Sequence, residues 1–382
     1  MFFLIASSII GVAATAITAK TLVGYTTLKW WIKLLVTLVI LFCWFGYSVL
    51  WYTRRYNWLS PTQYNIFSYC AYVGLGFAFI LLALLLFRDF TWFAGYEITK
   101  LFKANWYENL NPCNNYNLNI ANIATVMLTI MLTGWGMYEA CKFPEIKTIT
   151  IRDSKITKPL KIVQINDLHI NRTTPVVKIE NFVEKVNALK PDVIVLVGDV
   201  VDELPDKIKS QVEALSKLNA QYGKYTVFGN HDFYAGLLPW LREFVRLHFG
   251  LLFNNGATID NAIYIAGIPD KSIHDAGVFG KIDVEKALSD NKNNLYTILL
   301  SHTPKFTEEP LKGIDLQLSG HTHGGQIFPF HFLAKLHNKY LAGLYQEDGY
   351  KVYVSRGAGY WGPPIRLFAP SDITVINLEP EE

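Results

Sequence analysis

The sequence predicts an α/β domain that follows an all-α transmembrane domain. The 382 residues are 51% hydrophobic and only 18% charged, which is too apolar for an ordinary soluble enzyme. The apolar excess lies before about residue 141, and after Pro144 short β-rich runs alternate with helical stretches. Such alternation is typical of a layered α/β domain. We therefore expect a multi-span membrane domain over residues 1–143 and a second domain over residues 144–382.

Four apolar stretches of the first domain are predicted to cross a membrane as helices. They are Phe2–Ala19, Leu34–Tyr52, Ile66–Phe87 and Ile120–Ala140. Each is close to the roughly 20 residues that a helix needs to cross the hydrocarbon core. The alternatives are a soluble helical bundle and, for the first stretch, a cleaved signal peptide. Four such stretches in succession argue against the bundle, and the first lacks the basic start of a signal peptide.

The polar segments between these stretches carry basic residues on both sides of the membrane in nearly equal number. The positive-inside rule therefore does not predict which side the second domain faces. The Asn-rich segment from Asp89 to Leu118 is expected to be a loop, and the alternative is a segment that lies on the membrane surface. The net charge is +3 and the chain has no dense stripe of lysine and arginine, so no nucleic-acid partner is expected.

Strands of the second domain are expected at eight places. They are Lys161–Asn166, Asp192–Val197, Lys224–Phe228, Ala262–Ile268, Tyr296–Leu300, Leu316–Leu318, Lys351–Ser355 and Ile373–Leu378. Helices are expected at Glu180–Leu189 and Pro205–Leu218, between the early strands. This order predicts that the early strands are parallel, because each pair is joined by a helical crossover.

Five clusters of possible metal ligands follow these strands, in most cases directly. They are Asp167-Leu168-His169, Gly198-Asp199-Val200-Val201-Asp202, Gly229-Asn230-His231-Asp232, Ser301-His302 and Gly320-His321-Thr322-His323. In open α/β sheets, ligands bind beyond the carboxyl ends of the strands. The clusters are therefore expected at one rim, where oxygen and nitrogen ligands would hold two divalent cations side by side.

Each residue type in the clusters suits a particular place in a two-metal site. A carboxylate is the natural bridge, since two nearby cations repel unless negative charge lies between them, and Asp199 is the candidate. Asp167 and His169 can hold one ion, and the side-chain oxygen of Asn230 can bind the other. The remaining imidazole ligands are His302, His321 and His323. Imidazoles suit Mn, Fe, Zn or Co better than Ca, so the identity of the metal stays open.

His231 is not needed as a ligand and is the candidate catalytic residue. An imidazole beside a metal centre can stabilise the charge that develops on phosphorus and protonate the leaving group. Metal coordination also lowers the pKa of water towards neutrality, which would supply the nucleophile. Asp202 and Asp232 are expected to support the site rather than to bind metal. No residue is predicted to bind the substrate.

On these residues the chain resembles the calcineurin-like metallophosphoesterase superfamily, over roughly residues 160–380. The family pattern D-x-H, G-D-x-x-D, G-N-H-D/E, H and G-H-x-H is met at every position. The resemblance implies a four-layer double β-sandwich flanked by helices. It also implies one metal held by Asp167, His169, Asp199 and His323, a second held by Asp199, Asn230, His302 and His321, and His231 in the place of the catalytic histidine.

Two further motifs resemble the membrane-associated bacterial branch of that superfamily. They are Gly-His-Thr-His-Gly-Gly-Gln-Ile at 320–327 and Ser-Arg-Gly-Ala-Gly-Tyr-Trp-Gly-Pro-Pro-Ile-Arg-Leu at 355–367. The branch includes phosphodiesterases and hydrolases of UDP-2,3-diacylglucosamine, a lipid A precursor. The chain departs from the family pattern at Asn166, where serine is frequent, and at Ser371-Asp372. Neither departure is expected to touch a ligand.

Together these patterns predict a dinuclear-metal phosphoesterase, anchored in the bacterial inner membrane, that hydrolyses a lipid-linked phosphodiester or pyrophosphate. The specific expectation is UDP-2,3-diacylglucosamine, cleaved to a lipid X-type monosaccharide phosphate and UMP in lipid A biosynthesis, with the catalytic domain in the cytoplasm. One alternative is a phosphodiesterase for another envelope or soluble substrate. Another is a membrane sensor or transporter with a regulatory phosphoesterase-like domain. The apolar and basic segment 326–345 is expected either to touch lipid or to pack as a helix beside the site.

Overall fold

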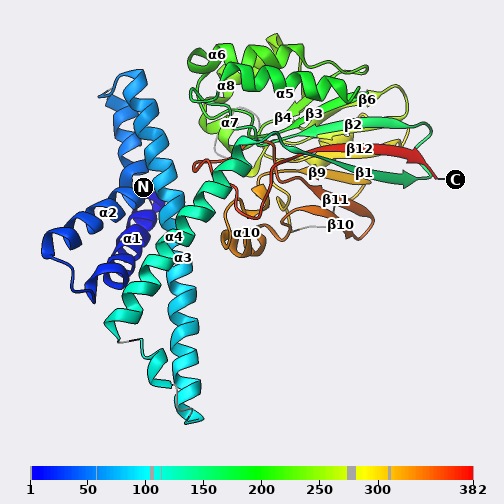
Figure 1. Cartoon of the computed structure of the whole chain (residues 1–382). Helices are drawn as coiled ribbons and strands as arrows, with labels where there is room; N and C mark the ends of the chain where they lie inside the picture. Colours follow the sequence, from blue (N-terminus) through cyan, green and yellow to red (C-terminus); the bar gives the residue numbers. More distant parts are fainter. Residues whose placement is uncertain are drawn as a thin grey trace. The chain divides into compact units, whose positions relative to one another are not determined.

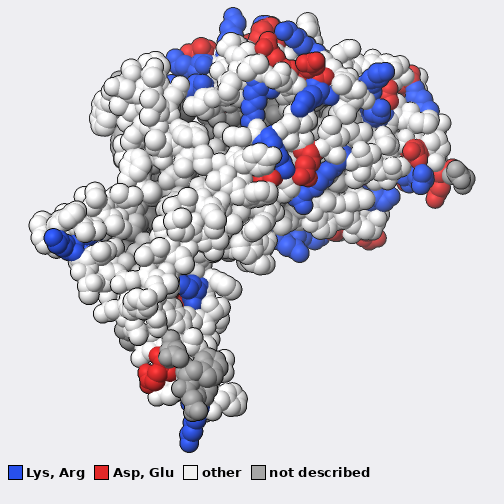
Figure 2. All heavy atoms as spheres, viewed as in Figure 1, with Lys and Arg blue, Asp and Glu red and all other residues white. Residues whose placement is uncertain are grey.

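The computed structural model describes residues 2–56, 58–103, 107–112, 114–272, 281–308 and 311–381, which form two compact units (Figure 1). The helical unit comprises Met1–Glu139 and Gly362–Leu367, and the α/β unit comprises Ala140–Trp361 and Phe368–Glu382. Charged side chains are dense on the visible face of the α/β unit and sparse on that of the helical unit (Figure 2). The contrast in charge that divides the sequence therefore also divides the structure.

The helical unit contains the long apolar helices that the sequence predicts. They are α1 (Phe2–Ala19), α2 (Trp30–Tyr56), α3 (Pro61–Leu101) and α4 (Asn115–Cys141). Among the described residues, three stretches are long and apolar enough to cross a membrane, namely Trp30–Leu50, Pro61–Leu101 and Asn115–Cys141. A shorter apolar helical stretch covers Ile9–Gly24. The predicted spans thus lie on helices, and three of these helices meet the length that a bilayer requires.

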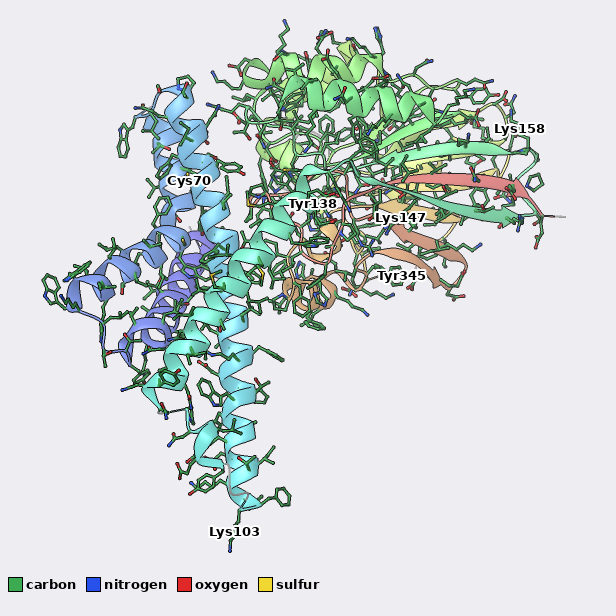
Figure 3. The ribbon with its side chains drawn as sticks, in the orientation of Figure 1. Cys70, Lys103, Tyr138, Lys147, Lys158 and Tyr345 are labelled. Carbon is green, nitrogen blue, oxygen red and sulfur yellow. The ribbon has the colours of Figure 1, made fainter. Side chains whose placement is uncertain are left out.

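The loop expected over Asp89–Leu118 is wrong for most of its described length. Helix α3 has 41 residues and continues to Leu101, close to Lys103 (Figure 3). A capping box at Ser60 and a proline in the first turn favour its start, and no proline interrupts its interior. Arg88, the first charge after the apolar run, pairs with Asp89 at 2.6 Å and donates to Asn122 at 2.8 Å. Polarity alone therefore did not end the helix.

The α/β unit is built on two six-stranded mixed sheets. The first has the order β1 (Glu145–Asp153), β12 (Asp372–Pro380), β2 (Leu160–Ile165), β3 (Val193–Val197), β4 (Lys224–Val227) and β5 (Gly250–Leu251). The second has the order β10 (Gly343–Glu347), β11 (Tyr350–Val354), β9 (Leu316–Ser319), β8 (Tyr296–Leu300), β7 (Ile263–Gly267) and β6 (Asn255–Ile259). Strands β2 to β5 are parallel, as predicted, and so are β7, β8, β9 and β11.

The central strands β3, β7, β8 and β9 are buried on both faces, which explains their largely apolar runs. In β3, Val193, Val195 and Val197 belong to the core between the two sheets, and the alternating Ile194 and Leu196 belong to the core under the helices. The helices of the unit are α5 (Val176–Ala188), α6 (Pro205–Glu213), α7 (Asn230–Tyr234), α8 (Leu237–Arg246), α9 (Val284–Leu288) and α10 (Phe330–Asn338). Helices α5, α6 and α8 cover the outer face of the first sheet (Figure 1). This arrangement is the predicted double β-sandwich with flanking helices.

Candidate metal centre

The predicted ligands follow the carboxyl ends of parallel strands in both sheets. Asp167 and His169 come after β2, Asp199 after β3, and Asn230 after β4. In the second sheet His302 comes after β8, and the pair His321 and His323 comes after β9. Parallel strands end at the same edge, so the two sheets together present these side chains at one rim. The residues that the sequence singled out are therefore brought together.

One group of possible ligand atoms comes from Asp167, His169 and His323, all of them buried. Nε2 of His323 lies 3.4 Å from Oδ1 of Asp167 and 3.0 Å from Nε2 of His169. Oδ1 of Asp167 lies 4.0 Å from Nε2 of His169. Two imidazole nitrogens and a carboxylate oxygen thus converge within the distances that ligands of a common ion show.

A second group comes from Asp199, His302 and His321. Oδ2 of Asp199 lies 3.2 Å from Nε2 of His302, and that nitrogen lies 3.2 Å from Nδ1 of His321. The same oxygen of Asp199 is 3.7 Å from Nε2 of His169, which belongs to the first group. Asp199 therefore lies between the two groups, in the position that a bridging carboxylate requires.

Asn230 supplies an independent sign that the site suits a cation. Its Oδ1 is buried and has no hydrogen-bond partner among the described residues. A buried polar atom without a partner is unfavourable by about 1–3 kcal/mol, so such atoms are rare in folded proteins. Asp167 and Asp199 are also buried, and burial of two carboxylates requires compensating positive charge. A pair of divalent cations would satisfy both demands, so the residues present fit a dinuclear centre.

Five of the predicted ligands have a left-handed backbone conformation. Asp167, His169, Asp199, His321 and His323 all have positive φ values, of 53°, 48°, 52°, 68° and 50°. Left-handed backbone is unfavourable by roughly 1–2 kcal/mol for residues with a side chain, and it clusters at functional sites. The five predicted ligands are therefore held by the surrounding loops in backbone conformations that residues with a side chain disfavour.

Glycines give the ligands room. A Cβ on Gly198 would lie 2.5 Å from Nδ1 of His302, and one on Gly320 would lie 2.5 Å from Oδ2 of Asp167. Both contacts are shorter than real Cβ atoms make. The Gly-Asp and Gly-His pairs of the sequence motifs thus serve a steric purpose, since a larger residue would push the ligand side chains out of place.

Asp202 holds two histidines with one oxygen. Oδ1 of Asp202 lies 2.8 Å from Nδ1 of His169 and 2.9 Å from Nδ1 of His231. Burial opposes ionisation of Asp202, but the two histidines outweigh it and hold the pKa of that carboxyl well below its usual range. Burial likewise lowers the pKa of His169, and the carboxylates of Asp202, Asp199 and Asp167 outweigh it and raise that pKa to about 9. The three carboxylates thus favour positive charge at His169.

His231 lies beside both metal groups. Its backbone N–H donates to Oδ1 of Asp199 at 2.8 Å, and its ring meets that of His169 edge to face at 4.7 Å. A ligand atom of His231 also lies within 4.8 Å of atoms of His169 and Asp199, so metal binding by this residue is sterically open. Because Nδ1 contacts Asp202, Nε2 is left to face a substrate or an ion.

Asp232 joins the two loops that carry Asp199 and Asn230. Its Oδ1 accepts from the backbone N–H groups of Val200 and Val201, at 2.8 and 3.0 Å, and its Oδ2 accepts from Gly229 at 2.9 Å. The carboxylate is fully buried. This placement agrees with the supporting role that the sequence suggested.

The loop Ser355–Gly359 lies against Asp167, and sequence reasoning linked it to the family but not to this ligand. The N–H of Gly359 donates to the carbonyl of Asp167 at 2.8 Å, and a Cβ on Gly357 would lie 2.5 Å from Cβ of Asp167. Asp372 supports the loop by accepting from Ser355 Oγ at 2.5 Å. The departure at Ser371-Asp372 therefore supports the ligand loop without touching a predicted ligand.

The expectation that Asn166 touches no ligand is wrong. Its side-chain amide donates to Oδ2 of Asp167. Asn166 directly precedes Asp167, and the tight left-handed turn at Asp167 folds the two side chains towards each other. The amide of Asn166 thus helps to fix the carboxylate of Asp167. A shorter side chain, such as the serine that is frequent here in the family, would have a different reach.

Asp270 is a buried carboxylate near the site that the sequence analysis missed. It accepts from Thr303 Oγ1 at 2.5 Å and from Ser272 at 2.9 Å, so it fixes the residue next to His302. Burial opposes its ionisation, but His302 and these hydrogen bonds lower the pKa of Asp270 below its usual value. The available signal was its place shortly after β7, at the same edge as the predicted ligands.

Comparison with known proteins agrees with this geometry. Residues 160–325 match the sequence model of the calcineurin-like phosphoesterase family. An uncharacterized metallophosphoesterase of Campylobacter jejuni is 32% identical in an alignment 392 positions long, which covers 99% of each chain. One of Helicobacter pylori is 37% identical over 69% of this chain and 72% of its own. A Bos taurus transmembrane protein with metallophosphoesterase domain is 33% identical over 82% of this chain and 74% of its own.

The chain therefore belongs to the calcineurin-like metallophosphoesterase family, and it is a phosphoesterase hydrolase. Members of this family use a dinuclear centre of divalent metal ions, which confirms the predicted cofactor. The three apolar helices and the transmembrane relative also indicate a membrane protein. The predictions of family, fold and enzyme class are confirmed by these findings.

Proposed function

We propose that residues 1–143 anchor the protein in a membrane and that residues 144–382 form a catalytic domain with two metal ions. One ion would be held by Asp167, His169, Asp199 and His323, and the other by Asp199, Asn230, His302 and His321. The position of Asp199 between the two groups, 3.7 Å from His169 and 3.2 Å from His302, is the observation that carries this assignment. When bound, such a pair of ions activates water and neutralises charge on a phosphoryl group.

We propose that His231 is the catalytic residue of this site. Its contact with Asp202 fixes the imidazole so that Nε2 can donate a proton to the oxygen that leaves phosphorus. The alternative, in which His231 is a metal ligand, predicts loss of metal on substitution. The proposed role predicts loss of rate with the metal retained.

We propose a lipid-linked phosphodiester or pyrophosphate as the substrate, with UDP-2,3-diacylglucosamine as the specific candidate. Apolar helices in the same chain as the metal site would concentrate the enzyme where an acylated substrate resides. Hydrolysis of that substrate would give UMP and an acylated sugar phosphate, as one step of lipid A biosynthesis. The sequence motif at 355–367 supports the same branch of the family.

Purified full-length protein with Mn²⁺ tests this proposal. The expected result is release of UMP from UDP-2,3-diacylglucosamine in mixed micelles, with no release by an Asp199→Asn variant. Turnover of simple soluble phosphodiesters without release of UMP would overturn the specific substrate and favour a phosphodiesterase for another envelope or soluble substrate. The absence of any phosphoester hydrolysis at matched metal content would overturn the catalytic assignment.

The proposed substrate also requires a location. Lipid A precursors are made on the cytoplasmic face of the bacterial inner membrane, so we propose a multi-pass inner-membrane protein with its catalytic domain in the cytoplasm. A reporter enzyme fused after Glu382 reads this directly, because alkaline phosphatase is active outside the cytoplasm and β-galactosidase inside it. A C-terminus outside the cytoplasm would remove the lipid A role.

A further inference from the structure

A pocket of about 410 Å³ opens beside the candidate metal centre in the α/β unit. One wall is Gly324, which directly follows the predicted ligand His323. The rest of its lining combines three basic side chains, His331, Lys335 and Arg356, with aromatic and aliphatic ones. None of these residues belongs to the proposed ligand sets.

Arg356 connects the pocket to the loop of His323. A Cβ on Gly324 would lie 2.9 Å from Cγ and 3.3 Å from Nε of Arg356, so the arginine side chain lies directly along this glycine. Arg356 also extends from the loop that lies against Asp167. A group bound by Arg356 would therefore be adjacent to the loops that carry two predicted ligands.

The basic side of the pocket suits an anion. Lys335 is exposed on α10 and forms no ion pair with a described residue. The carboxylate of Asp372 lies 4.0 Å from Arg356, at the limit of an ion pair. Lys335 thus brings a positive charge to the pocket beside the guanidinium of Arg356, and a phosphate is a group that arginine and lysine together recognise well.

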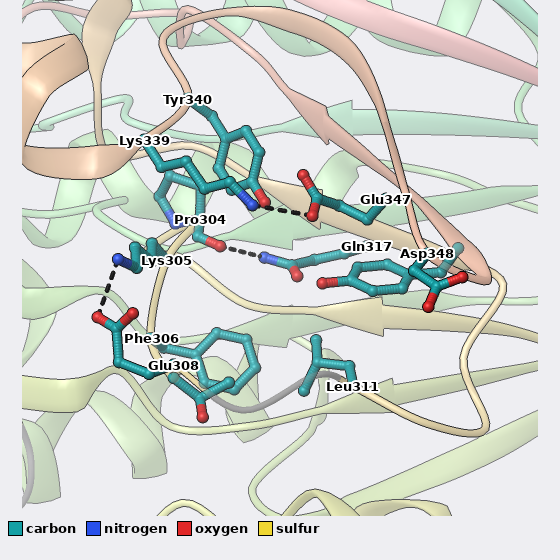
Figure 4. Close-up of a pocket in the computed structure, with 12 residues that line it drawn as sticks. Pro304, Lys305, Phe306, Glu308, Leu311, Gln317, Lys339, Tyr340, Glu347 and Asp348 are labelled. Atoms are coloured by element: carbon teal, nitrogen blue, oxygen red, sulfur yellow. Dashed lines mark hydrogen bonds and ion pairs between the residues drawn. The ribbon is translucent and has the colours of Figure 1, made fainter.

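Another pocket of the unit differs in this respect. Its lining residues all follow His302 in the chain, and Figure 4 shows them. There Lys305 pairs with Glu308 at 2.8 Å, and Lys339 pairs with Glu347 at 2.8 Å. Because each of these lysines already has a carboxylate partner, this pocket suits an anion less than the pocket that contains Lys335 does.

An exposed apolar face continues from the basic pocket. Phe328 stacks on His331 at 4.8 Å and meets Phe368 edge to face at 5.8 Å. On α10, Phe332, Leu333 and Leu336 are 65%, 60% and 84% exposed, and Phe368 is 69% exposed. Residues three and four apart lie on the same face of a helix, so these side chains form one surface. We call Phe332, Leu333, Leu336 and Phe368 the α10 face.

A contiguous exposed apolar surface beside a basic pocket is uncommon in a domain that contacts water alone. Tyr345, on β10, adds an aromatic ring to the pocket wall (Figure 3). The combination matches an amphiphile with a phosphate at one end and a hydrocarbon chain at the other. Lipids of this kind are always available to a chain with membrane helices.

We propose that this pocket and the α10 face bind a phosphate-bearing membrane lipid, with the phosphate at Arg356 and Lys335 and the acyl chain along Phe368 and Leu336. The inference rests on the proposed function, and it makes the lipid the substrate that the metal centre cleaves. The bound lipid would present its phosphoester next to the loop of His323. Water-soluble phosphodiesters would lack the contacts of the α10 face.

Two matched substrates test the proposal with full-length protein in micelles. 4-Nitrophenyl hexadecyl phosphate and 4-nitrophenyl ethyl phosphate share a leaving group and differ in the hydrocarbon chain. The parent protein is expected to favour the hexadecyl ester in kcat/KM. The Leu336→Ser variant should reduce the ratio of the two kcat/KM values at least tenfold. Lys335→Gln should lower both kcat/KM values at least tenfold, because both esters carry the phosphate that Lys335 is proposed to bind. Leu238→Ser and Lys292→Gln, at exposed positions elsewhere in the unit, should leave both values unchanged.

A ratio in the Leu336→Ser variant within twofold of the parent value would overturn the proposal, because the α10 face would then not bind the hydrocarbon chain. Parental kcat/KM values for both esters in the Lys335→Gln variant would overturn it as well, because Lys335 would then not bind the phosphate. Failure of the parent to hydrolyse either ester would instead count against the proposed function.

Labelling with a lipid tests the site without turnover. Full-length protein in nanodiscs that contain phosphatidic acid with a diazirine in its acyl chain is irradiated, digested and mapped by mass spectrometry. Label is expected on peptides from 328–342, and Lys335→Gln should reduce it at least fivefold relative to the label on the membrane helices of the same sample. Label on the helices without label on 328–342 would overturn the inference.

Discussion

Oδ1 of Asp202 lies 2.9 Å from Nδ1 of His231, so one half-buried carboxylate fixes the ring of the proposed catalytic residue. The same oxygen lies 2.8 Å from Nδ1 of His169, a proposed metal ligand. When Nδ1–H of each ring donates to the carboxylate, each Nε2 is left as the reactive nitrogen. Asp202 thus couples the orientation of a ligand to that of the catalytic residue, and loss of its charge should affect both.

The Asp202→Asn variant tests this coupling. An amide can offer its NH₂ group to Nδ1, which would favour the wrong tautomer of both histidines. We expect kcat to fall about 10–100-fold, with weaker metal binding as well, since partners of ligands contribute effects of this size. Steady-state kinetics and metal analysis measure the two effects. Asp206→Asn, at an exposed position of α6, is the control. Equal kinetics in the Asp202→Asn and Asp206→Asn variants would refute the coupling.

The His231→Ala variant separates catalysis from metal binding. We expect the metal content of the parent with activity lowered about 10²- to 10⁴-fold, which is the usual effect of removing a general acid. Metal analysis of the purified protein and hydrolysis of a nitrophenyl phosphodiester give the two readouts. If the variant instead purified with less metal, His231 would be a ligand, as its proximity to His169 and Asp199 also permits.

Much of this arrangement follows from the sequence because buried parallel strands leave a strong pattern. Strand β8 has the predicted bounds Tyr296–Leu300, and β3 differs by one residue at its start, since both are buried throughout and largely apolar. Strands β1 (Glu145–Asp153) and β10 (Gly343–Glu347) were missed because they are largely exposed and contain polar residues, so neither forms a continuous apolar run. β1 pairs with β12 at the other end of the domain, a contact that no local pattern contains.

The site divides in the same way. The position of candidate ligands such as Asp199 at the rim was predictable, because each closely follows a strand and belongs to a recognisable motif. Asp270 follows β7 without a recognisable motif, and its role depends on Thr303, a residue of another loop. Asn166 was misjudged because its contact with Asp167 depends on a left-handed turn that the sequence does not announce. Contacts set by tertiary packing were therefore the part that sequence reasoning missed.

A pair of glycines separates backbone strain from crowding at the metal centre. Gly357 has a φ of 78° and lies against Asp167, whereas Gly349 has a φ of 83° and open space around its missing side chain. Gly349→Ala should lower stability by about 1–2 kcal/mol through strain alone, with normal metal content. Gly357→Ala should add a steric loss of about 1–3 kcal/mol and weaken metal binding, because Asp167 must move.

Thermal unfolding and metal analysis of the two glycine variants, side by side, make the comparison. A Gly357→Ala protein with the metal content and stability of Gly349→Ala would show that the loop Ser355–Gly359 does not fix Asp167. The same outcome would weaken the link between Arg356 and the metal centre, since Arg356 belongs to this loop.

The proposed bridging role of Asp199 makes a prediction about the number of bound metal ions. If Asp199 serves both ions and Asp167 serves one, equal Asp-to-Asn changes should have unequal effects on metal content. We expect the parent to bind about two ions per chain, as dinuclear hydrolases do. Asp167→Asn should mainly lose one ion, whereas Asp199→Asn should weaken both, because each ion loses its shared ligand and the two cations then repel across the gap. Each asparagine is close in size and shape to the aspartate that it replaces, so packing changes little.

Calorimetric titration of metal-free protein with Mn²⁺ resolves the two sites. An Asp199→Asn protein that keeps one tight site of parental affinity would show that Asp199 is not the bridge, because a bridging carboxylate serves both ions.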